Sequence, residues 1–142
     1  MSAQSTSYID LSQAALRARY PLLARNVGNR DSMWPFESEG VACDPGWSAL
    51  IARVFDEIET AIAGQKQSGV PEKKWPLVEQ VKQKFGELCI YISNSTTAID
   101  AAILYATQRS RLTCAVCAQP GVKRVIGGWQ LATVCDEHAR EK

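Results

Sequence analysis

Four potential metal ligands near the C-terminal end constrain the fold of this chain more than any other feature. Cys114 and Cys117 form one pair with a two-residue spacer, and Cys135 and His138 form a second pair with the same spacer. Two such pairs can close a tetrahedral Zn²⁺ site with three thiolates and one imidazole. We therefore predict one Zn²⁺ ion per chain, bound by these four residues.

The segment between the two ligand pairs has the pattern of a β-hairpin. Residues 122–134 contain two β-prone runs that meet at Gly127 and Gly128, and such a glycine pair is typical of a tight turn. The second ligand pair then opens a short helix, expected from Asp136 to Lys142, and Trp129 is expected to pack over the hairpin beside the metal. This order of knuckle, hairpin and helix indicates a treble-clef or zinc-ribbon-like module. Because four protein ligands leave no position for water, the predicted metal is structural.

Other interpretations of the cysteines are weaker. The four could be a chance cluster of buried or disulfide-bonded residues, or a redox pair. Redox Cys-x-x-Cys motifs lie between a strand and a helix, whereas Cys114 follows an expected helix and precedes a Pro-Gly turn. Cys89 is expected in the core, and Cys43 in a loop. His138 is the only histidine, so no Cys-His or Ser-His pair remains for catalysis, and we predict no enzyme activity.

Composition narrows the function classes further. The chain has 142 residues, of which 46% are hydrophobic, so it can bury one core with a small metal-bound appendix. A formal net charge of +1 is low for a protein that coats nucleic acid. The sequence has no secretory signal and no apolar run near the ~20 residues that span a bilayer. We expect a soluble protein in the bacterial cytoplasm, without membrane contact.

The first half of the chain is expected to be mainly helical. Asp10 or Ser12 can cap a helix to about Ala24, with Pro21 bending or ending it. Residues 25–45 are rich in Gly, Asn, Ser and Pro and indicate a long irregular loop. A second helix is predicted from Asp44 to about Ala63, where Gly64 would stop it before a polar linker over 65–74.

The second half alternates β and α signals. Residues 76–85 fit a helix or a strand equally well, because the spacing of their apolar residues is compatible with the period of a helix and with that of a strand. Leu88–Ile92 is expected to be a strand, and Ala98–Arg109 a helix. The predicted fold is α+β: a helical body with a short β element (1–110), and a structural zinc module (111–142) docked on it.

Several elements together resemble a group of small proteins of tailed bacteriophages and prophages. They are Gly46-Trp47 at a helix start, the string Val81-Lys-Gln-Lys-Phe-Gly-Glu-Leu88, and the Cys-x-x-Cys and Cys-x-x-His pairs with Gly128-Trp129 between them. The resemblance covers roughly residues 40–140. Those proteins usually carry a basic residue after the position of Leu88, where this chain has Cys89. The resemblance implies a phage or prophage setting and supplies no activity.

Candidate binding residues lie in the aromatic and basic parts of the body. Trp34, Phe36 and Trp75 lie in or beside expected loops, where aromatic side chains can anchor an interface or stack on a ligand. Lys82, Lys84 and Arg109 could line, with Trp75, a cleft for an anionic nucleotide. Acidic residues are interspersed among these cations, so a solvated surface is the simpler interpretation.

Three functional hypotheses follow. The first is a non-enzymatic binding protein that engages a host protein and blocks a defence or regulatory factor. The second is sequestration of a nucleotide signal in the cleft of Lys82, Lys84, Arg109 and Trp75. The third is a nucleic-acid-binding accessory protein that uses the zinc module.

Overall fold

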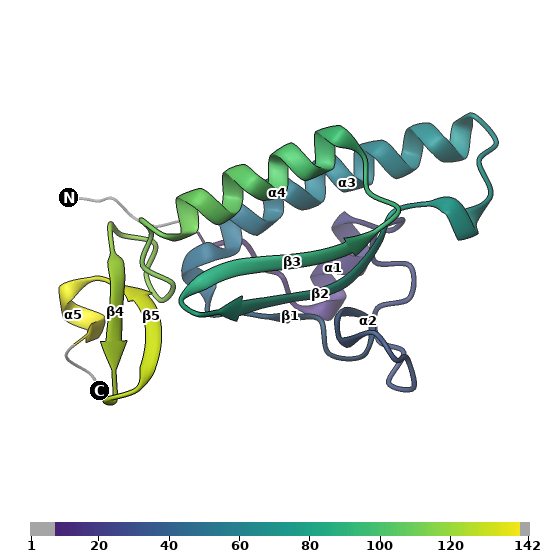
Figure 1. The fold of residues 1–142 in the computed structure, drawn as a ribbon. Coiled ribbons are helices and arrows are strands. Elements are labelled where there is room, and N and C mark those ends of the chain that lie inside the picture. Colours follow the sequence, from purple (N-terminus) through teal and green to yellow (C-terminus); the bar gives the residue numbers. More distant parts are fainter. Residues whose placement is uncertain (1–7, 140–142) are drawn as a thin grey trace.

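Two long helices cover a small sheet in the body of the molecule (Figure 1). The structure is a computed structural model, which describes residues 8–139. Helices α3 (Ser48–Gln67) and α4 (Thr97–Ser110) lie side by side. The sheet has the strand order β1 (Val41–Ala42), β2 (Leu77–Lys84) and β3 (Glu87–Ser93), with β1 parallel and β3 antiparallel to β2. The α+β class expected from the sequence is confirmed.

The first helix is shorter than predicted. Helix α1 (Gln13–Arg19) begins after Ser12, whose hydroxyl accepts a hydrogen bond from the Ala15 N–H at 3.3 Å. It ends before Pro21, because the residue preceding a proline is pushed out of the helical region. The next backbone N–H groups, of Leu22 and Leu23, donate to the Glu59 carboxylate at 3.0 and 2.8 Å. The Glu59 carboxylate from α3 thus caps a separate turn, in which the Ala24 N–H donates to the Tyr20 carbonyl at 2.8 Å, so the chain does not form one continuous helix up to Ala24.

The expected irregular loop over 25–45 contains regular structure. It holds the short helix α2 (Pro35–Glu39) and strand β1. Proline at the first helical position and glycine just after the last favour this short helix. The buried Glu37 carboxylate accepts from Asn26 and Ser32 at 3.1 and 2.6 Å, which ties the preceding turn to α2. The prediction of an irregular loop was therefore wrong for residues 35–42.

Helix α3 also runs past its predicted end. It follows a 3₁₀ turn at Pro45–Trp47 and continues through Gly64 to Gln67. A glycine inside a helix costs only about 1 kcal/mol relative to alanine. The apolar face of α3 supplies much more than this, because Ile51, Phe55, Ile58 and Ile62 are completely buried. A second 3₁₀ turn, Glu72–Lys74, leads into the sheet.

Residues 77–84, which fitted helix and strand equally, form strand β2. Val81 pairs with Ile90 and Val78 with Ile92, so the apolar side chains of the two strands share one face. Phe85 and Gly86 form the two-residue loop between the strands. Helix α4 follows β3, and its cap is Thr96, whose hydroxyl accepts from the Ile99 N–H at 3.1 Å.

The core of the molecule lies between α3, α4 and the inner face of the sheet. Trp47 is completely buried in it. Rings of Tyr20 and Phe36 contact Phe55 edge to face, each with ring centroids 5.6 Å apart. The N-terminal segments therefore pack into the same core as the long helices.

The C-terminal residues form the predicted hairpin and helix. Strands β4 (Val122–Ile126) and β5 (Gln130–Val134) pair antiparallel, and helix α5 (Asp136–Ala139) follows. Figure 1 places this hairpin beside the turn that joins β2 and β3. The remainder of the expected final helix, 140–142, lies outside the described residues. No helix within residues 8–139 is long and apolar enough to cross a membrane.

Candidate metal centre

The first ligand pair lies in a tight turn of the backbone. The Cys114 N–H donates to the Gln119 carbonyl at 2.7 Å, and the Ala118 N–H donates back to the Cys114 carbonyl at 2.9 Å. Ala118 closes the turn with a φ of 70°, a left-handed backbone conformation that residues other than glycine seldom adopt. This turn brings the Cys114 and Cys117 side chains to the same side.

The second ligand pair lies where β5 passes into α5. Cys135 follows the last residue of β5, and the Ala139 N–H donates to its carbonyl at 3.0 Å. One helical turn then separates Cys135 from His138, and residues three apart on a helix lie on one face. The hairpin between the pairs returns the chain so that this face meets the turn of Cys114 and Cys117.

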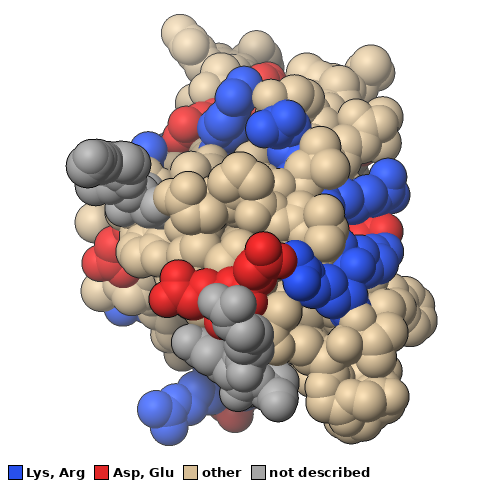
Figure 2. Space-filling view, turned by 90° about the vertical axis from the view of Figure 1, so that its left-hand side faces the viewer, with Lys and Arg blue, Asp and Glu red and all other residues tan. Residues whose placement is uncertain are grey.

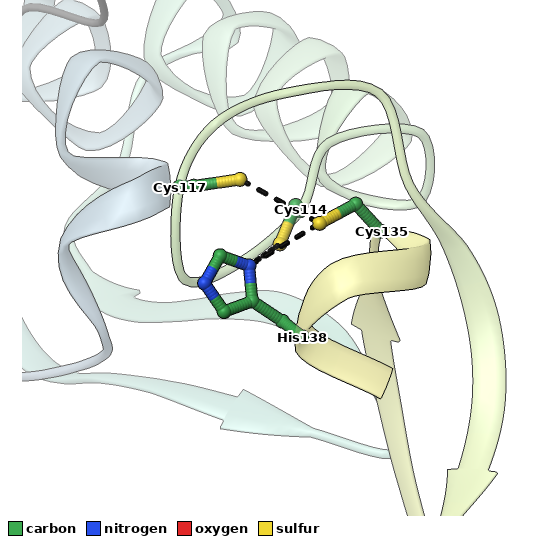
Figure 3. Close-up of side chains that lie close together, drawn as sticks. All are labelled: Cys114, Cys117, Cys135 and His138. Carbon is green, nitrogen blue, oxygen red and sulfur yellow. Dashed lines mark hydrogen bonds between the residues drawn. The ribbon is translucent and has the colours of Figure 1, made fainter. Parts of the chain in front are cut away.

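The four side chains converge on one point (Figure 3). Their ligand atoms all lie within 4.8 Å of one another. The Cys117 and Cys135 sulfur atoms are 3.7 Å apart, and His138 Nδ1 lies 3.6 Å from Cys114 Sγ and 3.2 Å from Cys135 Sγ. All four residues come from the loop and helix that flank the hairpin, as the sequence spacing predicted.

These separations fit one metal ion in tetrahedral coordination. With metal–sulfur bonds of about 2.3 Å and metal–nitrogen bonds of about 2.0 Å, two sulfurs lie about 3.7 Å apart and a sulfur and a nitrogen about 3.5 Å apart. Two of the three separations match these values and the third is slightly shorter. The cluster can therefore hold a metal ion that takes thiolate and imidazole ligands, with Nδ1 as the imidazole donor atom.

The protein surroundings act differently on two of the thiols. Burial disfavours ionisation of Cys114, but hydrogen bonds from the backbone N–H groups of Cys117, Cys135 and Val116 outweigh it and lower the pKa of the Cys114 thiol. For Cys117, burial and the neighbouring sulfurs of Cys114 and Cys135 raise the pKa to about 11. Three sulfurs this close ionise together only with a cation among them, because like charges repel. The arrangement is thus suited to a bound cation.

Gly46 and Trp47 attach the metal centre to the body, a contact that the sequence analysis missed. The Gly46 N–H donates to the Ala115 carbonyl at 2.7 Å, and the Trp47 indole N–H donates to the Thr113 carbonyl at 2.9 Å. A Cβ atom at Gly46 would lie only 2.3 Å from the Cys114 carbonyl oxygen. Only glycine lets the backbone of residue 46 approach the Cys114 carbonyl this closely. The Gly46-Trp47 pair, just before α3, was therefore the sequence signal from which this contact could have been inferred.

The turn between β2 and β3 makes a second attachment. The Thr133 hydroxyl donates to the Gly86 carbonyl at 2.6 Å. The Glu87 carboxylate binds Lys123 at 2.8 Å and Arg111 at 3.1 Å. Hydrogen bonds from these two cations hold the pKa of the Glu87 carboxyl below its ordinary value. The hairpin is thus fixed to the body at its base.

The aromatic candidates occupy different environments from those expected. Phe36 is buried with 1% exposure, and Trp34 is half-buried. Trp75 is buried with 8% exposure, because the Arg25 guanidinium lies 5.2 Å above its ring and its indole N–H donates to the Val70 carbonyl at 2.9 Å. Trp129, expected to pack beside the metal, is instead 81% exposed, since it lies at the outer end of the hairpin.

The basic candidates are not gathered in one cleft. Leu77 and Lys84 are the ends of β2, about 23 Å apart at a rise of about 3.3 Å per residue, so Trp75 and Lys84 lie at opposite ends of the sheet. Strand alternation places Lys82 on the face opposite Val81, whereas α4, which carries the exposed Arg109, packs into the core on the Val81 side. The expected cleft of Lys82, Lys84, Arg109 and Trp75 is not formed.

A different cleft lies between the body and the hairpin, with a volume of about 520 Å³. Its walls include Asp44, Gln83, Gln130 and His138, and none of the described lining residues is a lysine or arginine. The Cys43 thiol also lines it, and burial, with the neighbouring Asp44 and Cys89, raises the pKa of that thiol to about 12. The cleft therefore offers neither a cation for an anionic ligand nor a thiolate at neutral pH.

Figure 2 shows the end of the molecule that carries the hairpin. Lys and Arg side chains form small groups on this face, with Asp and Glu beside or between several of them and other residue types over much of the rest of the described surface. Among the described residues on this face, the basic groups do not join into the continuous track that a protein coating nucleic acid would need.

A scan against protein-family models, a search of curated proteins and a search of solved structures each gave no match to the chain.

Proposed function

We propose that this protein is a zinc-stabilised binding protein without enzymatic activity, encoded by a phage or prophage, that binds and inhibits a host protein in the bacterial cytoplasm. The observation that carries the proposal is the closed ligand set of Cys114, Cys117, Cys135 and His138. Four protein ligands fill the tetrahedral coordination shell of a metal ion and leave no position for water, so the metal has a structural role in this proposal.

The chemistry of the ligands supports zinc as the metal. Three thiolates with one imidazole, in a tetrahedral arrangement, form a ligand set that structural Zn²⁺ sites use. Zinc has no redox chemistry and brings the two ligand pairs together as a permanent cross-link. In this proposal the metal holds the C-terminal hairpin in shape and takes no part in a reaction.

The residues of the cleft between the body and the hairpin support a protein without catalytic activity. The Cys43 thiol is protonated at neutral pH because its pKa is raised to about 12. The only histidine belongs to the metal centre, so it is not available to activate a nucleophile there. A cleft without an activated nucleophile or a free general base is suited to binding rather than to turnover.

Exposed apolar side chains support a protein partner. Met33, Phe85 and Trp129 are 80%, 67% and 81% exposed. Large apolar side chains held in water are typical of surfaces that another protein covers. The phage setting comes from the resemblance described above, and inhibition of a host defence or regulatory factor is an extension of that setting by analogy.

The two other hypotheses have less support. For nucleotide sequestration, the Trp75 ring that would stack on a base is covered by Arg25, and the cleft between the body and the hairpin contains Asp44 without a lysine or arginine among its described lining residues. For nucleic-acid binding, the formal net charge is only +1 and the basic groups of Figure 2 are interrupted by acidic ones. A protein partner requires none of these missing features.

Native mass spectrometry of the tagged protein, recovered from a bacterial lysate, tests the proposal. We expect one zinc ion per chain and a stoichiometric host protein, whose activity falls when the complex forms. A stoichiometric nucleotide would replace the proposal with sequestration. Zinc without any partner, in lysates of several host species, would contradict the binding function and leave the metal assignment intact.

A further inference from the structure

Phe85 occupies a conformation that its side chain disfavours. It forms with Gly86 the two-residue loop between β2 and β3, and φ is positive at both residues, 54° and 81°. This is the geometry of a type I′ turn, in which asparagine followed by glycine is strongly preferred. A bulky residue with positive φ is an outlier that often marks a functional position. The chain therefore keeps an aromatic ring at a site where asparagine would fit better.

Packing of the Phe85 ring inside the protein does little to offset this unfavourable conformation. Its side chain is 67% exposed, and the Lys84 ammonium lies 5.7 Å from the ring centroid. A ring that is two-thirds exposed buries little apolar surface to offset the unfavourable backbone conformation. A benefit in contact with another molecule would explain it.

The C-terminal hairpin carries further exposed apolar side chains. Gly86 lies against this hairpin, and Thr133 and Lys123 contact residues 86 and 87. Since side chains alternate along a strand, Val125 shares the face of Lys123, and it is 60% exposed. Trp129, at the end of the same hairpin, is 81% exposed. Phe85, at the tip of the β2–β3 hairpin, and Val125 and Trp129, on the C-terminal hairpin, are together named the hairpin-tip surface below.

Rigid elements support the hairpin-tip surface. The hydrogen bond from Thr133 to Gly86 and the ion pairs of Glu87 with Lys123 and Arg111 join the two hairpins. A preorganised apolar surface binds a partner at lower entropic cost than a mobile one. Its position is therefore suited to recognition.

Positive charge lies on the Phe85 side of the hairpin-tip surface. Lys82 and Lys84 take part in none of the ion pairs among residues 8–139, and both lie at the end of β2 just before Phe85. Arg111 and Lys123 share the single carboxylate of Glu87. An apolar surface with excess positive charge at its edge is complementary to apolar side chains next to acidic ones.

We propose that the hairpin-tip surface is the site at which a segment of another protein docks, with apolar side chains on Phe85, Val125 and Trp129 and a carboxylate near Lys82 and Lys84. This inference rests on the proposed binding function and assigns its contact site. A protein segment fits better than single-stranded nucleic acid because Glu87 lies among the cations, where it would repel a phosphate backbone.

A displayed library of random peptides is the probe. Peptides retained by the zinc-loaded protein are expected to pair aromatic or aliphatic residues with Asp or Glu, and to bind more weakly as salt increases. The substitutions Phe85→Asn and Trp129→Ser should each weaken the best peptide by about tenfold or more, as for central interface residues. Leu104→Asn, on the exposed surface of α4 with 57% exposure, is the matched control and should bind normally.

Thermal and urea unfolding of Phe85→Asn separate a binding role from a structural one. Asparagine suits the turn, so the variant should unfold at a higher urea concentration than the parent protein while it binds the peptide less well. A variant that is less stable than the parent would show that Phe85 serves the fold, and would overturn the proposal.

Other outcomes also decide the question. Unchanged peptide affinity in Phe85→Asn and Trp129→Ser would overturn the site, and the binding function would stand if these variants still retain the host protein in native mass spectrometry. Loss of the host protein from both variants but not from Leu104→Asn would support the site. Tighter binding of a single-stranded oligonucleotide than of any peptide, or dimerisation that Phe85→Asn abolishes, would assign the surface to a different partner.

Discussion

The body and the C-terminal module are held together in different ways. The body (residues 8–110) buries a continuous cluster of large side chains, among them Trp47, Phe55, Leu88 and Ile99. Within residues 111–139 the buried apolar residues are only Cys114, Ala115 and Val134. Hydrophobic burial stabilises the first region, whereas the second has too little apolar surface to fold by that means.

The difference indicates what a metal ion bound by the four ligands would contribute to stability. A hairpin with a single helical turn is at best marginally stable by itself. The ligand cluster closes the two ends of the hairpin, and the contacts of Gly46, Trp47 and Thr133 fix it to the body. Stability of the module should therefore depend on the ion and on the attachment, while stability of the body should depend on packing.

Removal of a metal ligand should have the largest effect on stability, and the effect should be confined to the C-terminal module. Cys135→Ser should abolish stoichiometric zinc and unfold residues 114–139, since a structural zinc site contributes on the order of 10 kcal/mol to the folding of such a module. Hydrogen exchange should become fast in this segment and stay slow in α3. The measurement is metal analysis together with exchange detected by mass spectrometry.

Cys89→Ser is the matched control, because Cys89 is a half-buried cysteine outside the cluster. It should keep the zinc and the slow exchange. Full zinc occupancy and a protected hairpin in Cys135→Ser would refute the assignment of that ligand.

A cavity in the body should produce the converse result. Phe55 is completely buried and contacts the rings of Tyr20 and Phe36. Phe55→Ala should lower the free energy of unfolding by about 3–5 kcal/mol. Urea unfolding gives the loss, and zinc content at low urea should remain one ion per chain. Loss of zinc under these conditions would mean that the module does not keep its own fold.

A methyl group at the attachment point should have a smaller effect. Gly46→Ala places a Cβ atom against the Cys114 carbonyl, and relief of this overlap should cost about 1–3 kcal/mol. Gly64→Ala is the control in the same helix region, where a Cβ would meet nothing within 4 Å, and it should stabilise by about 1 kcal/mol. Equal stability of the two variants in thermal unfolding would argue against the close contact of Gly46.

The Glu87 ion pairs should have the smallest effect, and one that depends on pH. The pKa of Glu87 is lowered in the folded protein, so its stabilising contribution is present above the unfolded pKa near 4.5 and is lost as pH falls through the folded pKa. Glu87→Gln should therefore be less stable than the parent by about 0.2–1 kcal/mol near pH 7.

The difference between parent and Glu87→Gln should shrink towards zero as the pH is lowered below 4.5, whatever the metal ligands do in both proteins. Parallel urea titrations at each pH measure it. A difference that persists at the lowest pH would mean that the amide disturbs packing rather than an ion pair.

Local sequence signals predicted the metal centre well but the body only in part. Ligand spacing and the Gly127-Gly128 turn depend on neighbouring residues, so the hairpin and its four ligands could be derived. The register of β2 depends on Leu88 and Ile90, across the turn, so its apolar pattern alone fitted a helix equally well. Gly64 failed to end α3 because tertiary packing outweighs one unfavourable residue.

The contacts between regions could not be derived from local pattern at all. Trp75 is buried because Arg25, distant in sequence, covers its ring, and Trp129 is exposed because the hairpin projects its end away from the body. The requirement for glycine at position 46 comes from the carbonyl of Cys114. Such facts arise only when distant segments meet.

The hydrogen bond from Trp47 to Thr113 has a practical consequence. It joins the indole of the body to the residue immediately before the first metal ligand. Release of the module would leave this indole N–H without its acceptor and open one side of the ring to water. The emission spectrum of Trp47, isolated by replacing the other three tryptophans, would then report metal uptake and release in real time, without any added dye.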